Sequence, residues 1–147
     1  MENNELKEKS DSESKHDKAS AQEYENLLRE KICLTIRNRM KKAQKYSSYD
    51  IKEYKVFFLS FQERSELIRV IDIYCPGFQR ELKKRHPELN RNDILLCRFY
   101  LLDLSILQTA ILLGTDYSSI RKRTSRLKEK IGDSEIHQYL KSLFFAF

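Results

Sequence analysis

Glycine and proline are scarce in this chain of 147 residues, which contains three glycines and two prolines. Multi-stranded sheets with many tight turns depend on both residues, so their scarcity argues against a sheet protein. No run of 18 apolar residues occurs, and the sequence therefore predicts no transmembrane helix. The start, MENNELKEKSDSES, has no apolar core of the kind found in signal peptides. We expect a cytoplasmic protein.

Cysteine and histidine spacing gives no sign of a metal site. The three cysteines lie in apolar surroundings without CxxC spacing, at Cys33, Cys75 and Cys97. They are expected to be buried, reduced thiols. The three histidines lack metal-ligand spacing, and the three glycines fall at predicted helix ends instead of in a phosphate-binding loop. The sequence therefore predicts no enzyme, no metal and no cofactor.

Charge is unevenly distributed along the chain. The formal net charge is +6, but residues 1–30 hold five Lys/Arg and nine Asp/Glu, a net of −4, which leaves +10 for residues 31–147. A folded region this basic favours a polyanionic partner, with nucleic acid ahead of a membrane surface.

Residues 1–19 are polar and rich in Ser, Glu and Lys, which predicts a disordered tail. A helical N-terminal segment is expected at 20–87. Its first helix should begin at a capping box, Ser20 with Glu23, and run to about Lys45. That helix has a basic outer face, which we expect to be solvated; a contact to DNA phosphates and an interface with a partner helix are the open alternatives. Residues 46–55 indicate a loop or a broken helix, and the run 55–59 fits either a helix or a strand.

Capping residues and helix breakers then alternate at helix-length intervals. Ser60 and Glu63 form a second capping box, and Cys75-Pro76-Gly77 ends the helix that they begin. A brief helix around Phe78 and Leu82 closes at His86-Pro87, and Asn90 caps the next helix with Asp93 at its third position. This alternation predicts an all-α fold.

Residues 88–147 form the predicted DNA-binding domain. An apolar helix pattern covers 94–102, a break follows at 103–105, and a short helix at 106–113 begins at a capping box and ends at Gly114. Asp116 is expected to cap a third, basic helix, 116–131. A fourth helix carries Ile136, Tyr139, Leu140 and Leu143. Two short helices joined by a tight turn, the second of them basic, are typical of a helix-turn-helix.

The stretch from Leu89 to Leu143 resembles the LuxR/GerE-type helix-turn-helix of bacterial transcription regulators. Ala110 matches the alanine of the family's second helix, Ile120 its inward-facing valine, and Lys130-Ile131-Gly132 its Lys-Leu-Gly ending. The upstream run from Ser60 to Cys97 is similar to the C-terminal output region of sensor-type regulators with tetratricopeptide repeats. The resemblance implies a helical bundle that ends in a four-helix LuxR-like domain.

The resemblance also implies a function: sequence-specific DNA binding by a transcription regulator, with helix 116–131 in the major groove. By the family's geometry, the base-facing residues are Arg121, Lys122 and Ser125. Arg121 can donate two hydrogen bonds to guanine. Phosphate contacts, which fix register without reading sequence, are expected from Ser119, Arg123, Arg126 and Lys128.

The implied partners are double-stranded DNA, a second copy of the chain through the C-terminal helix, and an upstream sensor protein in signal transduction. The alternative is a helical protein-interaction adaptor whose helix-turn-helix does not bind DNA. It is motivated by Thr109, which stands where the family has an aliphatic residue, and by the apolar terminus with Phe144, Phe145 and Phe147. A fragment like region four of a sigma factor would use the same DNA geometry, but no polymerase-binding segment is evident.

Overall fold

Every regular element in the described part of the chain, residues 21–46 and 50–146 of a computed structural model, is a helix. A helical segment at 21–28 is followed by α2 (Lys31–Ala43), the 3-10 helix η1 (Ile51–Phe57), α3 (Phe61–Tyr74), α4 (Phe78–Arg85), α5 (Arg91–Leu101), α6 (Ile106–Leu113), α7 (Tyr117–Ile131) and α8 (Ile136–Ala146). The predicted all-α fold class is confirmed. The predicted tail, 1–19, and the capping box at Ser20 lie outside the described residues.

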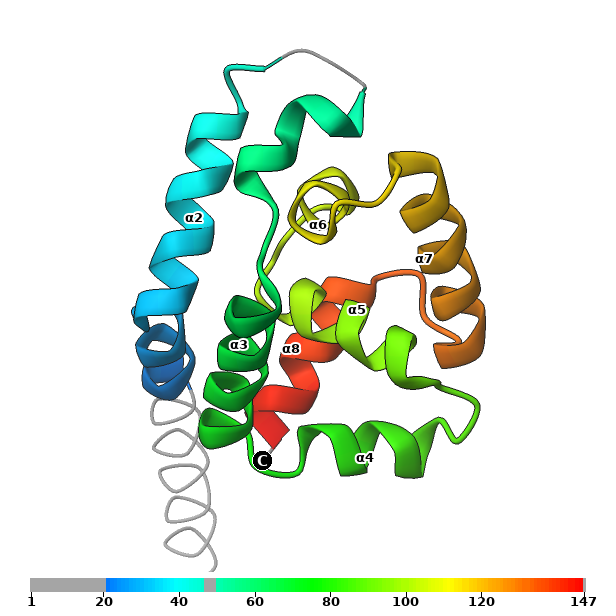
Figure 1. Ribbon diagram of the computed structural model, residues 1–147. Coiled ribbons are helices and arrows are strands. Elements are labelled where there is room, and N and C mark those ends of the chain that lie inside the picture. The colour runs from blue at the N-terminus through cyan, green and yellow to red at the C-terminus, as the bar shows by residue number, and fades with distance from the viewer. Residues whose placement is uncertain (1–20, 47–49, 147) are drawn as a thin grey trace, which may run out of the picture.

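The helices surround a central α5. Figure 1 shows α8 behind α5, α2 along the left side, α7 along the right side, and α4 across the base. One hydrophobic cluster contains side chains from all of these helices, and its largest fully buried members are Tyr100, Phe78 and Phe99. The described residues of the predicted N-terminal segment and those of the predicted C-terminal domain therefore contribute to the same core.

Helix α5 is buried on nearly all sides, as its apolar pattern predicts. Eight of its eleven residues are buried, among them the charged Asp93 and Arg98. It begins at the predicted cap, where Asn90 Oδ1 accepts a hydrogen bond of 2.8 Å from the Asp93 N–H and Asp93 Oδ2 accepts one of 3.0 Å from the Asn90 N–H. It ends before Asp103, whose left-handed φ of 66° turns the chain toward α6.

The two other predicted capping boxes in the described residues are also present. The Ser60 hydroxyl accepts from the Glu63 N–H at 3.1 Å, and the Glu63 carboxylate accepts from the Ser60 N–H at 2.9 Å. Ser105 and Gln108 make the equivalent pair at 3.1 and 2.9 Å. Each pair satisfies two donors at the start of a helix, which sets where α3 and α6 begin.

The prediction of one helix from residue 20 to 45 is wrong, because the chain bends at residues 29–30. Glu30 is extended, with φ −60° and ψ 146°, and the Tyr74 hydroxyl donates to its carboxylate at 2.7 Å. The bend separates two packing directions. Tyr24, before it, donates from its hydroxyl to the Leu101 carbonyl at 2.6 Å, whereas α2, after it, packs along α3.

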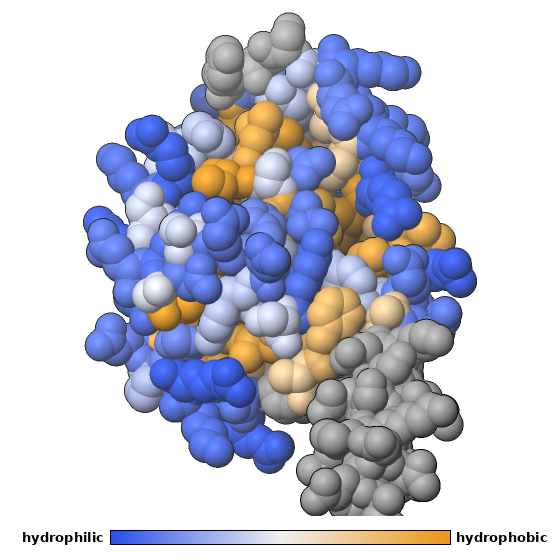
Figure 2. All heavy atoms as spheres, turned by 180° about the vertical axis from the view of Figure 1, so that it is seen from behind, coloured by the Kyte–Doolittle hydropathy of each residue, from blue (hydrophilic) through white to orange (hydrophobic). Residues whose placement is uncertain are grey.

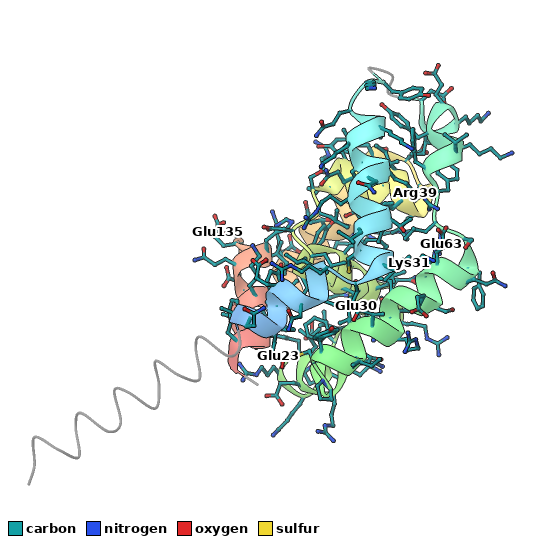
Figure 3. The ribbon with its side chains drawn as sticks, turned by 90° about the vertical axis from the view of Figure 1, so that its left-hand side faces the viewer. Glu23, Glu30, Lys31, Arg39, Glu63 and Glu135 are labelled. Atoms are coloured by element: carbon teal, nitrogen blue, oxygen red, sulfur yellow. The ribbon has the colours of Figure 1, made fainter. Side chains whose placement is uncertain are left out.

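Arg39 fixes α2 to the start of α3. Its guanidinium donates to the Glu63 carboxylate at 2.9 Å, and Figure 3 shows the two labelled side chains facing each other between the helices. The run 55–59, which fits either a helix or a strand by sequence, divides instead: η1 ends at Phe57 and the next residues are extended. The Leu59 N–H donates to the Leu112 carbonyl at 2.8 Å, so this linker is attached to the end of α6.

Cys33, Cys75 and Cys97 are buried and form no disulfide. Burial raises the pKa of the Cys33 and Cys75 thiols to about 11 and that of Cys97 to about 12. The predicted burial of the three cysteines is confirmed, and their raised pKa values favour the neutral thiol at pH 7. Among the described residues, no helix has the length and apolar character needed to cross a bilayer.

Candidate nucleic-acid interface

A sharp turn joins α6 to α7. Gly114 ends α6 in the left-handed conformation, with φ 64° and ψ 35°, and the Thr115 N–H donates to the Ala110 carbonyl at 3.0 Å. A Cβ on Gly114 would lie 2.9 Å from the Phe58 ring. Glycine is thus required twice here, by the backbone conformation and by the ring that covers the turn.

The inner face of α7 is fixed to the core. Ile120, Thr124, Leu127 and Ile131 are buried along one face of the helix, at the spacing that 3.6 residues per turn predicts. The Thr124 hydroxyl donates to the Ile120 carbonyl at 2.7 Å, and the Tyr100 hydroxyl of α5 forms a hydrogen bond with Thr124 Oγ1. These contacts determine which side of α7 faces outward.

Lys130 holds the far end of α7. Its ammonium donates to Asp93 Oδ2 at 2.7 Å. Asp93 is 7% exposed and also completes the cap of α5. One carboxylate therefore stabilises the start of α5 and the end of α7. Lys130 was not assigned to the DNA-contacting residues, and its ion pair gives it a structural role.

All predicted site residues lie on the outer surface of α7. Arg121, Lys122, Arg123, Ser125 and Arg126 are exposed, and Ser119 and Lys128 are half-buried. At 100° per residue, positions 122 and 129 lie in the middle of the outward face, with positions 125 and 126 about 50° to either side. Positions 121 and 128 lie further round on the side of 125, and positions 119 and 123 lie on the side of 126.

The cations of this face have no carboxylate partners. Among the described residues, none of the five Lys and Arg side chains in the predicted site forms an ion pair. The first turn of α7 contains no acidic residue, and the helix carries one acid in all, Glu129. The outward surface of α7 is therefore predominantly positive, with Glu129 as its one carboxylate, and it stands on a helix that is fixed to the core.

The expectation that Asp116 caps α7 through its side chain is wrong. Asp116 occupies the N-cap position, but its carboxylate is exposed and accepts no hydrogen bond from any of the described residues. The backbone at φ −52° and ψ 140° starts the helix without it. The first N–H groups of α7 are thus left to an external acceptor. Tyr117 and Ser118, which are not among the predicted site residues, are exposed in the same first turn.

The apolar face of α8 is covered within the chain. Ile136, Leu140, Leu143 and Phe144 are buried, and the rings of Tyr24 and Phe144 meet edge to face with centroids 5.4 Å apart. The terminal aromatic residues thus cover the core of this chain as far as Phe145; Phe147 lies outside the described residues. A dimer through α8 would have to use its outward polar side chains.

The described histidines have structural partners. His86 Nε2 lies 2.6 Å from the Tyr139 hydroxyl, and His137 Nε2 lies 2.6 Å from the Leu104 carbonyl. Burial and the neighbouring Arg85 lower the pKa of His86, which favours its neutral form. No cluster of three metal-ligating side chains occurs in residues 21–46 and 50–146.

Comparisons of the chain with protein-family models, with curated proteins and with solved structures return no match. The resemblance of residues 89–143 to the LuxR/GerE-type helix-turn-helix therefore stays a prediction.

Proposed function

We propose that the protein is a sequence-specific DNA-binding regulator that inserts α7 into the major groove. The single observation that carries the proposal is the outward face of α7, where five unpaired cations stand on a helix that is fixed to the core from behind. A basic helix of this kind, following a short helix and a tight turn, suits the groove in shape and charge.

Base reading is assigned to Arg121, Lys122 and Ser125, and phosphate contact to Ser119, Arg123, Arg126 and Lys128. The free N–H groups at the start of α7 support the proposal, since a helix N-terminus binds phosphate oxygens well. Fixed orientation supports it too, because the buried contacts of Ile120 and Thr124 hold the neighbouring side chains in one direction. The resemblance to LuxR-type regulators adds a second copy of the chain and a sensor protein as proposed partners.

A salt titration of binding to a random duplex tests the proposal. The parent protein should bind at low salt and lose affinity linearly in a plot of log K against log salt, with a slope of about −0.9 per phosphate contact. Binding that is absent at low salt would contradict it. The alternative would then apply, in which the same helices form an adaptor that binds protein.

A further inference from the structure

A groove runs along the side of α2 that faces the α5–α6 junction. The residues that α2 contributes recur at helical spacing from Cys33 to Gln44, a length of about 16 Å at 1.5 Å per residue. Leu102 and Leu104 form the opposite wall, and the enclosed volume is about 380 Å³. In Figure 2, apolar surface lies beside the hydrophilic side chains of α2 at the right-hand edge.

The floor of the groove is apolar and its α2 rim is positive. Ile36 and Met40 line the floor, and Arg37 and Lys41 stand exposed above them. No acidic residue occurs between Lys31 and Lys45, so nothing on α2 offsets this charge.

The opposite wall adds little negative charge. Its one carboxylate, Asp103, accepts from the Lys141 ammonium at 2.6 Å. The wall is also rigid, because His137 of α8 contacts the Leu104 carbonyl and the Tyr24 hydroxyl donates to the Leu101 carbonyl. The groove is therefore a preformed apolar channel with a net positive rim.

We propose that this groove docks an acidic amphipathic helix of a partner protein. The apolar residues of that helix would lie over Ile36 and Met40, and its carboxylates would face Arg37 and Lys41. The length argues for a helix, because a channel of about 16 Å matches three helical turns. The charge argues for an acidic helix, because the positive charges of Arg37 and Lys41 are not offset by a carboxylate on α2, whereas the carboxylate of the opposite wall is paired with Lys141. The inference does not rest on DNA binding by α7, which is measured without the peptide.

Met40 gives a direct test, since the chain has only two methionines, Met1 and Met40. The full chain is labelled with ¹³C at the methionine methyl groups. It is titrated with a designed peptide of about 14 residues that has leucines on one face and glutamates along one edge. The glutamate peptide should shift the Met40 methyl signal. A control peptide with lysines in place of the glutamates should not.

Two double variants distinguish binding in the groove from a general effect of the protein's positive charge. Arg37→Gln with Lys41→Gln should weaken binding of the glutamate peptide about tenfold, as two exposed ion pairs lost together would. Arg80→Gln with Lys83→Gln removes the same charge from exposed positions on α4 and should leave binding unchanged.

Four results would overturn the proposal. The first is that both peptides bind equally, and the second is that the glutamate peptide binds without shifting the Met40 methyl signal. The third is that neither peptide binds. The fourth is that the Met40 signal shifts in the absence of peptide. In the last case, a shift that follows protein concentration would assign the groove to a second copy of the chain, and a shift caused by duplex DNA would assign it to nucleic acid.

Discussion

Helices α2 and α7 look alike in sequence and lie on opposite sides of the molecule (Figure 1). Both are amphipathic, both carry a basic outer face, and α2 has even fewer acidic residues than α7. Charge and periodicity alone would assign them the same role.

Their surroundings differ. The inner face of α7 is buried, its hydroxyl at Thr124 is paired with α5, and its end is held by the Lys130–Asp93 ion pair. Its outward cations lie at one side of the molecule, on a helix that follows a tight turn. Helix α2 has one of its cations, Arg39, turned inward to Glu63, and beside its basic face lies a groove. The comparison teaches that the neighbours of a basic helix, more than its charge, decide whether it suits a DNA groove or a partner helix.

The largest effect should come from removing the anchor of α7. Leu127 is fully buried, so Leu127→Ala should lower the free energy of unfolding by about 2–5 kcal/mol. Leu34→Ala on α2 is the matched control, because Leu34 is 41% exposed, and it should change stability by less than about 0.5 kcal/mol. Denaturant melting measures both. Equal losses would mean that α7 is packed no more firmly than the surface of α2.

Within α7, substitutions of base-contacting and of phosphate-contacting residues should affect DNA binding differently. Arg121→Ala should cost about 1–3 kcal/mol on the preferred duplex and flatten preference at one base pair, whereas Lys128→Ala should weaken all sequences alike and lower the salt slope by about one unit. A binding selection on randomised duplexes, followed by salt titrations, measures both. If both variants bound every duplex as the parent does, the proposal that α7 enters the major groove would be contradicted.

The turn before α7 can be compared with the turn after it. Gly114 and Gly132 are both left-handed, with φ 64° and 80°, but only Gly114 faces the Phe58 ring. Gly132→Ala should cost about 1–2 kcal/mol from backbone conformation alone, and Gly114→Ala should cost more. Adding Phe58→Ala should recover part of the excess in a double-mutant cycle. If Gly114→Ala and Gly132→Ala lowered the free energy of unfolding equally, the Phe58 ring would have moved aside without an energetic penalty.

Two buried threonines test the support beneath the interface. Thr124 makes two hydrogen bonds, whereas the Thr109 hydroxyl is buried and has no partner among the described residues. Thr124→Val should therefore cost about 1–3 kcal/mol, and Thr109→Val should be neutral or stabilise by about 1 kcal/mol. Melting curves that rank the two variants in the opposite order would contradict this account of the core.

The smallest effect concerns how α2 is held. The hydrogen bond from Arg39 lowers the pKa of Glu63 despite its partial burial. A carboxylate whose pKa is lower in the folded state stabilises the fold above its unfolded pKa, about 4.3, and this stabilisation is lost as pH falls through the folded pKa. The stability gap between the parent and Glu63→Gln should thus narrow from pH 7 to pH 3. A gap that stays constant over this pH range would contradict the assigned role of the Arg39–Glu63 ion pair.

Local signals made much of the fold predictable. The capping boxes at Ser60, Asn90 and Ser105 are each formed by residues three apart, so the sequence contains the whole motif. The left-handed end at Gly114 is similarly local. The inward face of α7 followed from periodicity, which placed Ile120 and Leu127 correctly in the core.

What the sequence did not predict depends on contacts between distant residues. The bend at Glu30 is stabilised by Tyr74, and the linker after η1 is attached to Leu112, a residue more than fifty positions away. The ion pair between Lys130 and Asp93 also joins residues far apart in the sequence. At Asp116 the residue type suits a cap, but the carboxylate accepts no hydrogen bond from the described part of the chain.

The most direct test of the central claim compares the two basic faces in one duplex-binding assay. Arg121→Gln, Lys122→Gln and Arg126→Gln remove three charges from α7. Lys31→Gln, Lys42→Gln and Lys45→Gln remove three charges from α2 and the segment just after it, since α2 ends at Ala43. All six residues are exposed, and each triple variant lowers the formal charge from +6 to +3. The α7 variant should lose about 100-fold or more in affinity at low salt, and the α2 variant about tenfold or less. Equal losses would contradict the account, because net charge, and not α7, would then determine DNA binding.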